Sequence, residues 1–211
     1  KGIYFKNVSF GYSEKLVLNN VSLEVALGRI TAVYGPSGVG KTSVLEELKK
    51  LDTPWSYPVS TTTRKPRLDE KRGEYYHFIS DENFTSRLAN GDFIEHAIVH
   101  GIQYGLQRVD LEAFWTQGIE KSILAVDIQG VRILKKLYPN VISIFLIPGS
   151  FSDLEERLQE RITDKPDDIA LRLANAKTEI NEHKSECDWY VVNHKNNLIT
   201  TVESIVNIID G

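Results

Sequence analysis

The octapeptide GPSGVGKT, residues 35–42, matches the pattern G-x-x-x-x-G-K-[ST] and governs how the rest of the chain is interpreted. It follows an apolar, strand-like stretch at residues 30–34 and opens a helical pattern over residues 41–51. A strand before the motif and a helix after it are the context in which this pattern forms a phosphate-binding loop. The plain alternative is a glycine turn that only starts a helix.

The residue types of this loop suit a nucleoside triphosphate. Glycines let backbone N–H groups turn toward phosphate oxygens, and the helix start adds partial positive charge. Lys41 can reach the transferable phosphate, and the Thr42 hydroxyl suits Mg²⁺. We expect ATP to be bound by Gly35, Ser37, Gly38, Val39, Gly40, Lys41, Thr42 and Ser43, with Thr42 as the metal ligand. The motif indicates ATP or GTP and leaves the reaction open.

The segments around the loop predict an α/β fold. Buried-type strand patterns at residues 123–126 and 141–147 are each followed by a helical pattern, at 131–137 and 154–162. This βαβα order predicts a mostly parallel sheet flanked by helices. The remaining patterns are strands at 3–10, 17–25, 30–34 and 189–192, helices at 166–186 and 198–209, and a loop around one short strand at 53–73.

Composition and charge exclude several classes. The 211 residues are 41% hydrophobic and 26% charged, which fits one or two compact domains and excludes disorder and collagen. The apolar run from Val141 to Pro148 is far shorter than the roughly 20 residues of a membrane-spanning helix. A net charge of -4 disfavours broad nucleic-acid binding, and the single cysteine, Cys187, allows no intrachain disulfide. We expect a cytoplasmic protein that binds no nucleic acid and does not insert into a membrane.

A second group of basic side chains indicates a second substrate. Arg64 and Arg67 lie on the polar loop, and Tyr76 follows downstream. Planar guanidinium groups and a phenolic hydroxyl suit the grip on a phosphate monoester. The alternative is a solvated charged loop, because residues 64–72 mix five basic side chains with two acidic ones.

Several motifs in register resemble the guanylate kinase family from about residue 30 to the C-terminus. They are STTTRKPR at 60–67, Glu70, Gly73, YHF at 76–78, FIE at 93–95, YG at 104–105, DIQG at 127–130, and Arg157, Arg161 and Arg172. The resemblance implies a GMP site made by Ser60, Arg64, Arg67, Glu70, Tyr76, Glu95, Tyr104 and Asp127. The arginines and tyrosines would hold the GMP phosphate, and Ser60, Glu95 and Asp127 would face the guanine. A carboxylate such as Glu95 accepts from the N1–H and 2-amino groups of guanine, donors that adenine lacks.

The resemblance also implies a lid that supplies cations to the reaction. Arg157 and Arg161 are four residues apart and share a helix face, and Arg172 follows one helix later. With Lys41 and Arg64 they form the expected catalytic set, although surface arginines are the plain alternative. Asn193 takes the adenine-side position of the family.

Two departures from the family pattern bear on activity. Ala125 stands where the family usually has the first carboxylate of Asp-x-Asp, which weakens metal support. Leu106 stands where the family usually has Ser or Thr, and the loss of that hydrogen bond predicts relaxed base selection. These departures keep open a guanylate-kinase-like binding module that has lost catalysis.

The front of the chain resembles another family. Residues 2–42, with FKNVSFGY at 5–12 and GRITAV at 28–33, are similar to the start of an ABC-transporter ATPase. That resemblance implies that Tyr12 stacks on adenine, although a hairpin residue covering a sheet edge is an equal alternative. The chain has no L-S-G-G-Q signature, so an ABC-type ATPase subunit is the least favoured function.

Together these observations predict a P-loop nucleoside monophosphate kinase fold with an extra N-terminal antiparallel β-element. We expect an ABC-like segment at 1–29 and a guanylate-kinase-like domain at 30–211, with a GMP-binding insertion at 60–105 and a lid at 155–180. The expected reaction is Mg²⁺-dependent phosphoryl transfer from ATP to GMP. The oligomeric state is left open, a homodimer included.

Overall fold

The structure, a computed structural model, describes residues 2–12, 15–26, 28–66, 73, 76–99, 101–160 and 166–211. For residues 2–26 and 166–168 it describes the backbone alone. No helix in this part of the chain is long and apolar enough to cross a membrane.

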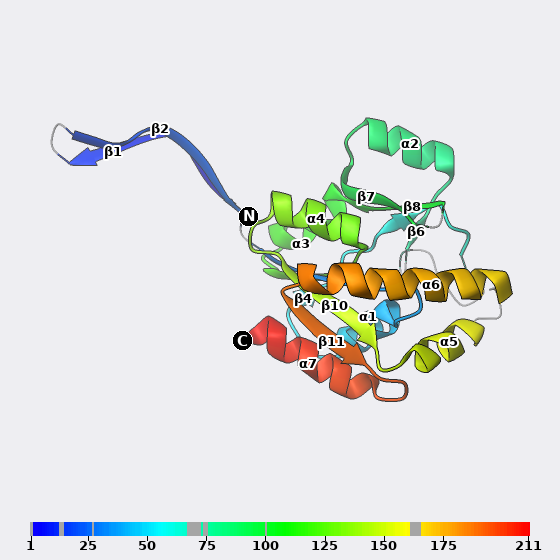
Figure 1. The fold of residues 1–211 in the computed structure, drawn as a ribbon. Coiled ribbons are helices and arrows are strands. Elements are labelled where there is room, and N and C mark those ends of the chain that lie inside the picture. Colours follow the sequence, from blue (N-terminus) through cyan, green and yellow to red (C-terminus); the bar gives the residue numbers. More distant parts are fainter. Residues whose placement is uncertain are drawn as a thin grey trace.

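A central parallel sheet organises the molecule (Figure 1). Its strands lie in the order β11–β10–β3–β9–β4, and every neighbouring pair is parallel. Their bounds are β3 Arg29–Tyr34, β4 Trp55–Ser56, β9 Lys121–Ala125, β10 Ile142–Pro148 and β11 Trp189–Asn193. The predicted α/β class with a mostly parallel sheet is confirmed.

Helices cover both faces of this sheet. The helices of the described residues are α1 Lys41–Lys49, α2 Asp81–Ala89, α3 Arg108–Thr116, α4 Ile128–Leu137, α5 Phe151–Gln159, α6 Pro166–His183 and α7 Leu198–Asp210, with a short 3₁₀ helix, η1, at Lys184–Glu186. Val33 packs with α1 and α7 on one face, whereas Ala32 packs with α3 and α4 on the other. This alternation follows from the two-residue period of a strand.

A second, smaller sheet forms the predicted insertion. Its strand order is β6–β5–β8–β7, with bounds β5 Thr61–Thr62, β6 His77–Phe78, β7 Phe93–Val99 and β8 Ile102–Gln107. The prediction of one short strand within residues 53–73 is wrong, because β4 and β5 both lie there and join different sheets. Two-residue strands are too short to show a hydrophobic period.

The predicted lid region contains α5 and α6. Leu154 and Leu158 of α5 and Ala176 of α6 are buried together in a small apolar cluster. Gly38 of the phosphate loop also lies against this cluster, because a Cβ there would approach Leu158 Cδ2 to 2.8 Å. The lid helices are therefore packed onto the phosphate loop.

The front of the chain forms a two-stranded antiparallel sheet of its own. β1 (Gly2–Tyr12) pairs with β2 (Lys15–Ala26) from Gly2 opposite Ala26 to Tyr12 opposite Lys15. Within the described residues neither strand joins the other two sheets. The predicted N-terminal antiparallel element is confirmed.

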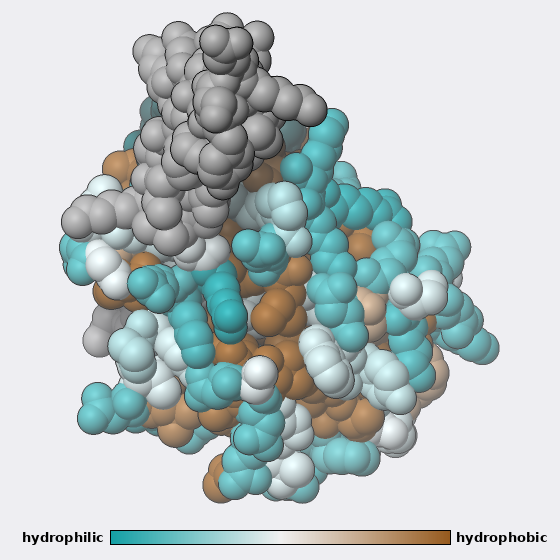
Figure 2. Space-filling model, turned by 90° about the vertical axis from the view of Figure 1, so that its left-hand side faces the viewer, coloured by the Kyte–Doolittle hydropathy of each residue, from teal (hydrophilic) through white to brown (hydrophobic). Residues whose placement is uncertain are grey.

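The surface combines polar and apolar side chains. Figure 2 turns the left-hand side of Figure 1 toward the viewer and shows hydrophobic residues in its middle, bordered by hydrophilic ones. The exposed large apolar side chains lie on several separate elements. Examples are Val109 on α3, Leu137 on α4 and Ile199 on α7. Scattered exposed apolar residues are normal in a folded domain.

Candidate active site

One cavity of about 400 Å³ brings together most of the residues predicted from the sequence. The phosphate loop and the start of α1 line one side with Gly35, Ser37, Gly38, Gly40, Lys41, Thr42 and Ser43. The small sheet and the strand end after β9 line the other with Ser60, Arg64, Tyr76, Glu95, Tyr104 and Asp127. The two predicted binding sites therefore share one cavity.

The phosphate loop owes its shape to glycine. Gly35, Gly38 and Gly40 have φ values of 142°, 87° and 100°, which L side chains rarely adopt. A Cβ at Gly35 would meet the main-chain carbonyl of Leu146, and one at Gly40 would lie 2.6 Å from Asn193 Nδ2. Side chains at these positions would force the loop open, which explains its glycines.

Lys41 lies against the loop that it follows. Its Nζ donates to the carbonyl oxygens of Gly35 at 2.5 Å and Pro36 at 3.1 Å. Thr42 and Ser43 come next on α1, and both line the cavity. The ammonium group and a hydroxyl oxygen therefore stand beside each other at the helix start, as the motif predicts.

Arg157 and Asn193 bind the phosphate loop by hydrogen bonds and do not line this cavity. Val39 O accepts from Arg157 Nη1 and Asn193 Nδ2, both at 2.8 Å, and Arg157 Nη2 donates to Asn193 O at 3.1 Å. Thr201 donates to Asn193 Oδ1 at 3.0 Å, so both ends of this buried amide are bonded within the protein. Val39 itself is fully buried in the core and does not line the cavity. Val39 and Asn193 were expected to bind ATP and Arg157 to act as a catalytic lid arginine, whereas the structure gives all three contacts that shape the loop.

Arg172 of α6 reaches the cavity side of the loop. Its Nη1 lies 3.5 Å from Ser37 Oγ. Ser37 lines the cavity and Arg172 does not, so Arg172 lies next to the cavity wall and its catalytic role stays a prediction.

Arg64 and two tyrosines form the cationic and hydroxyl part of the opposite wall. The Arg64 guanidinium carbon lies 5.5 Å from the ring centroids of both Tyr76 and Phe78, and Tyr76 meets Tyr104 edge to face at 5.9 Å. Arg64 Nη1 donates to Lys65 O at 2.9 Å. The aromatic rings hold the guanidinium plane in place, which favours a fixed grip on phosphate.

Two carboxylates lie together at the far end of the cavity. Glu95 is only 5% exposed, and burial, reinforced by the negative charge of Asp127, raises the pKa of its carboxyl to about 8. Its carboxylate accepts from the main-chain amide of Leu106. Gly130 leaves room for it, because a Cβ there would lie 2.6 Å from Glu95 Oε2. A desolvated carboxyl beside a second one is typical of a recognition or catalytic site.

Asp127 has a structural task as well. It is the N-cap of α4: Oδ1 accepts from the Gly130 amide at 2.8 Å, and Oδ2 accepts from Gln129 Nε2 at 3.1 Å. Asp127 therefore both caps α4 and lines the cavity. One carboxylate fixes the helix that presents it.

The two departures from the family pattern differ in position. Ala125 lines the cavity and offers no oxygen there. Leu106 is fully buried in the apolar cluster beneath α3 and α4. The side chain at 106 thus supports the floor of the site and supplies no hydrogen bond to a base.

Sequence reasoning missed part of the wall. Ile128 and Gln129 at the start of α4, and Glu179 and His183 on α6, also line the cavity. The four-residue spacing of Glu179 and His183 was the available signal, since it places both on one helix face.

Four predicted residues fall outside what the structure describes. Arg67, Glu70 and Arg161 lie in undescribed segments, and of Tyr12 the backbone alone is described, at the end of β1. Their predicted roles stay predictions.

A phosphate loop after the first central strand, facing arginine and tyrosine on a small second sheet, defines a P-loop kinase of the nucleoside monophosphate type. The comparisons with known proteins agree with this class. The family model described as Guanylate kinase matches residues 28–210, and the chain therefore belongs to the guanylate kinase family.

Individual relatives agree. The guanylate kinase of Thermotoga maritima is 42% identical over 183 residues, which is 86% of each chain. That of Alkalilimnicola ehrlichii is 40% identical over 79% of this chain and 81% of the relative. The crystal structure of guanylate kinase from Anaplasma phagocytophilum is similar with a TM-score of 0.71 and 32% identity, covering 87% of this chain and 85% of that one. The matched region begins at residue 28 and gives no support to an ABC-like front segment.

Proposed function

We propose that this chain transfers the terminal phosphoryl group of ATP to GMP, giving ADP and GDP, with Mg²⁺. The observation that carries the proposal is the shared cavity, with the phosphate loop on one wall and Arg64, Tyr76 and Glu95 on the other. Two anion sites that face each other suit a direct transfer between two bound phosphates.

The phosphate groups give each cationic residue a task. An oxygen of the GMP phosphate attacks the terminal phosphorus of ATP, and the bond from that phosphorus to the bridging oxygen of ADP breaks. Negative charge accumulates on the oxygens between donor and acceptor. Lys41 lines the donor side of the cavity, Arg172 contacts Ser37 on that side, and Arg64 lines the acceptor side. Their charges are most useful when the lid excludes water.

The two carboxylates select the acceptor base. Ionised Glu95 accepts from the N1–H and 2-amino groups of guanine, and Asp127 stands beside it. Adenine offers no matching donors and would leave a buried charge unpaired. Ser60 lines the same cavity and completes the proposed base site.

The donor atoms at the start of α1 fit Mg²⁺. Thr42 offers a hydroxyl oxygen beside the phosphate loop, and Mg²⁺ prefers oxygen ligands while keeping several waters. Within the described residues no group of three or more His, Cys, Asp or Glu side chains could hold a metal. Bound there, Mg²⁺ supplies charge neutralisation between the two terminal phosphates of ATP.

A coupled assay of ADP release with and without GMP tests the proposal. We expect ADP release only in the presence of GMP, with GDP formed in equal amount. A catalytically reduced binding module, which Ala125 and Leu106 keep as the second candidate, would bind GMP in a calorimetric titration without releasing ADP. ADP release that ignores GMP would indicate an ATPase and contradict the proposal.

Three narrower expectations belong to this proposal. The ABC-like origin of residues 1–29, with Tyr12 near adenine, is a hypothesis that rests on sequence resemblance alone. The homodimer and the cytoplasmic location are likewise predictions. Sedimentation of the purified chain would test the homodimer.

A further inference from the structure

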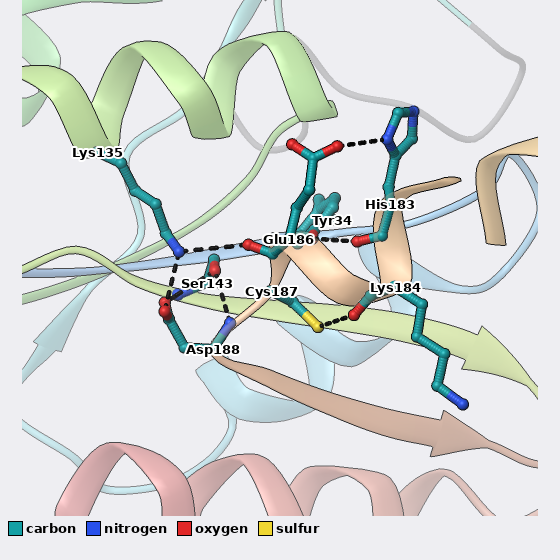
Figure 3. A network of polar contacts seen from close by, with 8 residues as sticks. All are labelled: Tyr34, Lys135, Ser143, His183, Lys184, Glu186, Cys187 and Asp188. Carbon is teal, nitrogen blue, oxygen red and sulfur yellow. Dashed lines mark hydrogen bonds and ion pairs between the residues drawn. The ribbon is translucent and has the colours of Figure 1, made fainter. Parts of the chain in front are cut away.

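Two networks of polar contacts lie beside the residues that line the nucleotide cavity. One, at the end of α6, joins His183 to Glu186 and Ser143 to Asp188 (Figure 3). It ties the segment after α6 to β10 of the central sheet. The second network is centred on Gln107 and belongs to the small sheet, whose residues form the wall opposite the phosphate loop. The reaction proposed above gives Gln107 no task.

Gln107 is a buried polar residue outside the cavity wall. It ends β8 and immediately precedes α3, and it is only 8% exposed. It does not line the nucleotide cavity. Its carboxamide has an acceptor oxygen and an NH₂ group that donates, and in the protein interior both need partners. Those partners show what the side chain holds in place.

Three neighbouring elements supply the partners. Gln107 Oε1 accepts from Arg87 Nη1 of α2. Gln107 Nε2 donates to Thr61 Oγ1 of β5 at 2.9 Å and to Asp110 Oδ2 of α3 at 3.2 Å. The orientation of the amide follows from these contacts, because a guanidinium only donates and a carboxylate accepts. Asp110 Oδ2 also lies 3.5 Å from His77 Nε2 of β6. One side chain thus joins β8 to α2, β5 and α3.

The bond to Thr61 matters because β5 is very short. Its two residues, Thr61 and Thr62, pair with two residues of β8. So short a strand has few ladder hydrogen bonds to fix its register. Thr61 is fully buried, and the cavity residues Ser60 and Arg64 lie one residue before it and three residues after it. The bond from Gln107 therefore helps to hold this part of the cavity wall against β8.

The same side chain follows the amide that holds Glu95. Phe93 of β7 lies opposite Gln107, and Glu95 lies opposite Leu106. One residue of β7, Ile94, is left over between these pairs, as in a β-bulge, a feature that re-aims side chains beside active sites. The Glu95 carboxylate accepts from the Leu106 amide. The bonds of Gln107 fix the chain directly after that amide.

We propose that Gln107 positions the acceptor site by fixing β5, which leads to Arg64, and the end of β8, which holds Glu95. Gln107 is a positioning residue that acts through Thr61 and the Leu106 amide. The inference rests on the proposed phosphorylation of GMP and names a determinant of GMP binding. None of the bonds described for Gln107 involves the phosphate loop, so binding of ATP should not depend on it.

A pair of variants at Thr61 tests the central bond. Thr61→Val keeps the β-branched shape and removes the hydroxyl that accepts from Gln107, whereas Thr61→Ser keeps a hydroxyl. We expect Thr61→Val to lower kcat/KM for GMP by about three- to tenfold, the effect of one buried hydrogen bond. The KM for ATP should stay within about a factor of two. Thr61→Ser should keep the wild-type kcat/KM for GMP.

Two further variants complete the experiment. Gln107→Leu removes all three bonds and should lower kcat/KM for GMP by roughly tenfold or more. Thr61→Val covers the case that Gln107→Leu fails to fold. Ser143→Ala is the matched control, because Ser143 Oγ donates to Asp188 Oδ2 at 2.8 Å in the network at the end of α6 (Figure 3). It also removes a hydroxyl from the interior and should lower Tm, with kcat/KM for GMP kept within about a factor of two.

The results separate this inference from the proposed function. An unchanged kcat/KM for GMP in folded Thr61→Val, or in folded Gln107→Leu, overturns the positioning role and leaves GMP phosphorylation intact. An equal loss in Ser143→Ala also overturns it, because any weakening of the fold would then have this effect. If the wild-type chain turns over no GMP, the proposed function fails, and calorimetry with GMP decides the positioning role alone. Weaker binding by Thr61→Val than by wild type and Thr61→Ser supports the role, and equal or absent binding overturns it.

Discussion

At the scale of single residues, the guanine contact proposed for Glu95 would link base selection to proton release. The free protein buries this carboxyl next to Asp127, and burial raises its pKa to about 8. Guanine donates two hydrogen bonds and so needs the ionised form. If Glu95 binds guanine as proposed, binding of GMP releases a proton wherever the solution pH lies below that pKa.

This linkage predicts a pH dependence for GMP that ATP does not share. Affinity for GMP should rise by up to about tenfold per pH unit below pH 8 and level off above it. Measurements from pH 7 to 9 avoid the second ionisation of the GMP phosphate near pH 6. Glu95→Gln should bind GMP weakly and without this slope, and a flat wild-type profile would contradict the linkage.

Arg64 belongs to the same scale, because its guanidinium plane faces both the Tyr76 ring and the acceptor side of the cavity. Arg64→Ala should lower kcat/KM for GMP by about 10²-fold or more, the loss expected for two charge-assisted hydrogen bonds. Affinity for ATP, measured by calorimetry, should change little. Arg64→Lys keeps the charge but loses the fork and should recover only part of the rate. Retained turnover in Arg64→Ala would remove this residue from the acceptor site.

At the scale of elements, α4 shows one side chain with two tasks. Asp127 caps the helix through the Gly130 amide and also lines the cavity beside Glu95. Asparagine caps a helix as well as aspartate does, whereas alanine does not. The two substitutions therefore separate the cap from the charge.

We expect Asp127→Ala to lower the free energy of unfolding by about 1 kcal/mol and Asp127→Asn to leave it nearly unchanged. Thermal unfolding should show this as a fall of roughly 2–4 °C in Tm for the alanine variant only. Burial is the main cause of the raised pKa of Glu95, and Asp127→Asn removes the charge that adds to it, so GMP binding by this variant should rise with pH over a lower range than in wild type. Equal destabilisation by both variants would show that the cap contributes nothing.

The same scale explains how far the sequence could be interpreted. The phosphate loop, the parallel strands and the lid helices were predicted because their signals are local: a motif, a hydrophobic period and a four-residue spacing. The small sheet was harder, because buried polar residues such as Glu95 and Gln107 interrupt the apolar pattern of β7 and β8.

Long-range contacts left no such local signal. Arg157 and Asn193 bond to Val39 across 118 and 154 residues of chain, so nothing in their neighbourhood showed that they support the loop from behind. Their side chains were expected at the nucleotide because the family pattern assigns positions, whereas the contacts depend on the folded arrangement. The same holds for His183, whose ring is oriented by Arg132 through Glu186.

At the scale of the whole molecule, the site is the meeting place of two sheets and a helix pair. The central sheet contributes the phosphate loop and Asp127, and the small sheet contributes Arg64 and Glu95. Helix α6 contributes Glu179 and His183 to the cavity wall, and its Arg172 contacts Ser37. Each group of contacts is incomplete without the others, so the proposed transfer needs all three units together.

The front sheet stands outside this arrangement. β1 and β2 pair with each other, and the cavity is lined by residues from Tyr34 onward. A chain that starts at Gly28 should therefore keep its kcat/KM for GMP and for ATP within about a factor of two, as for changes that touch no site residue. Gly28 is retained because it packs against Trp115.

The full chain with Tyr12→Ala is the matched comparison. If Tyr12 stacks on adenine, as the ABC-like resemblance implies, the truncated chain and Tyr12→Ala should both raise the KM for ATP. Loss of GMP turnover in a truncated chain whose circular dichroism is native would contradict an independent kinase core and would assign the front sheet a part in catalysis.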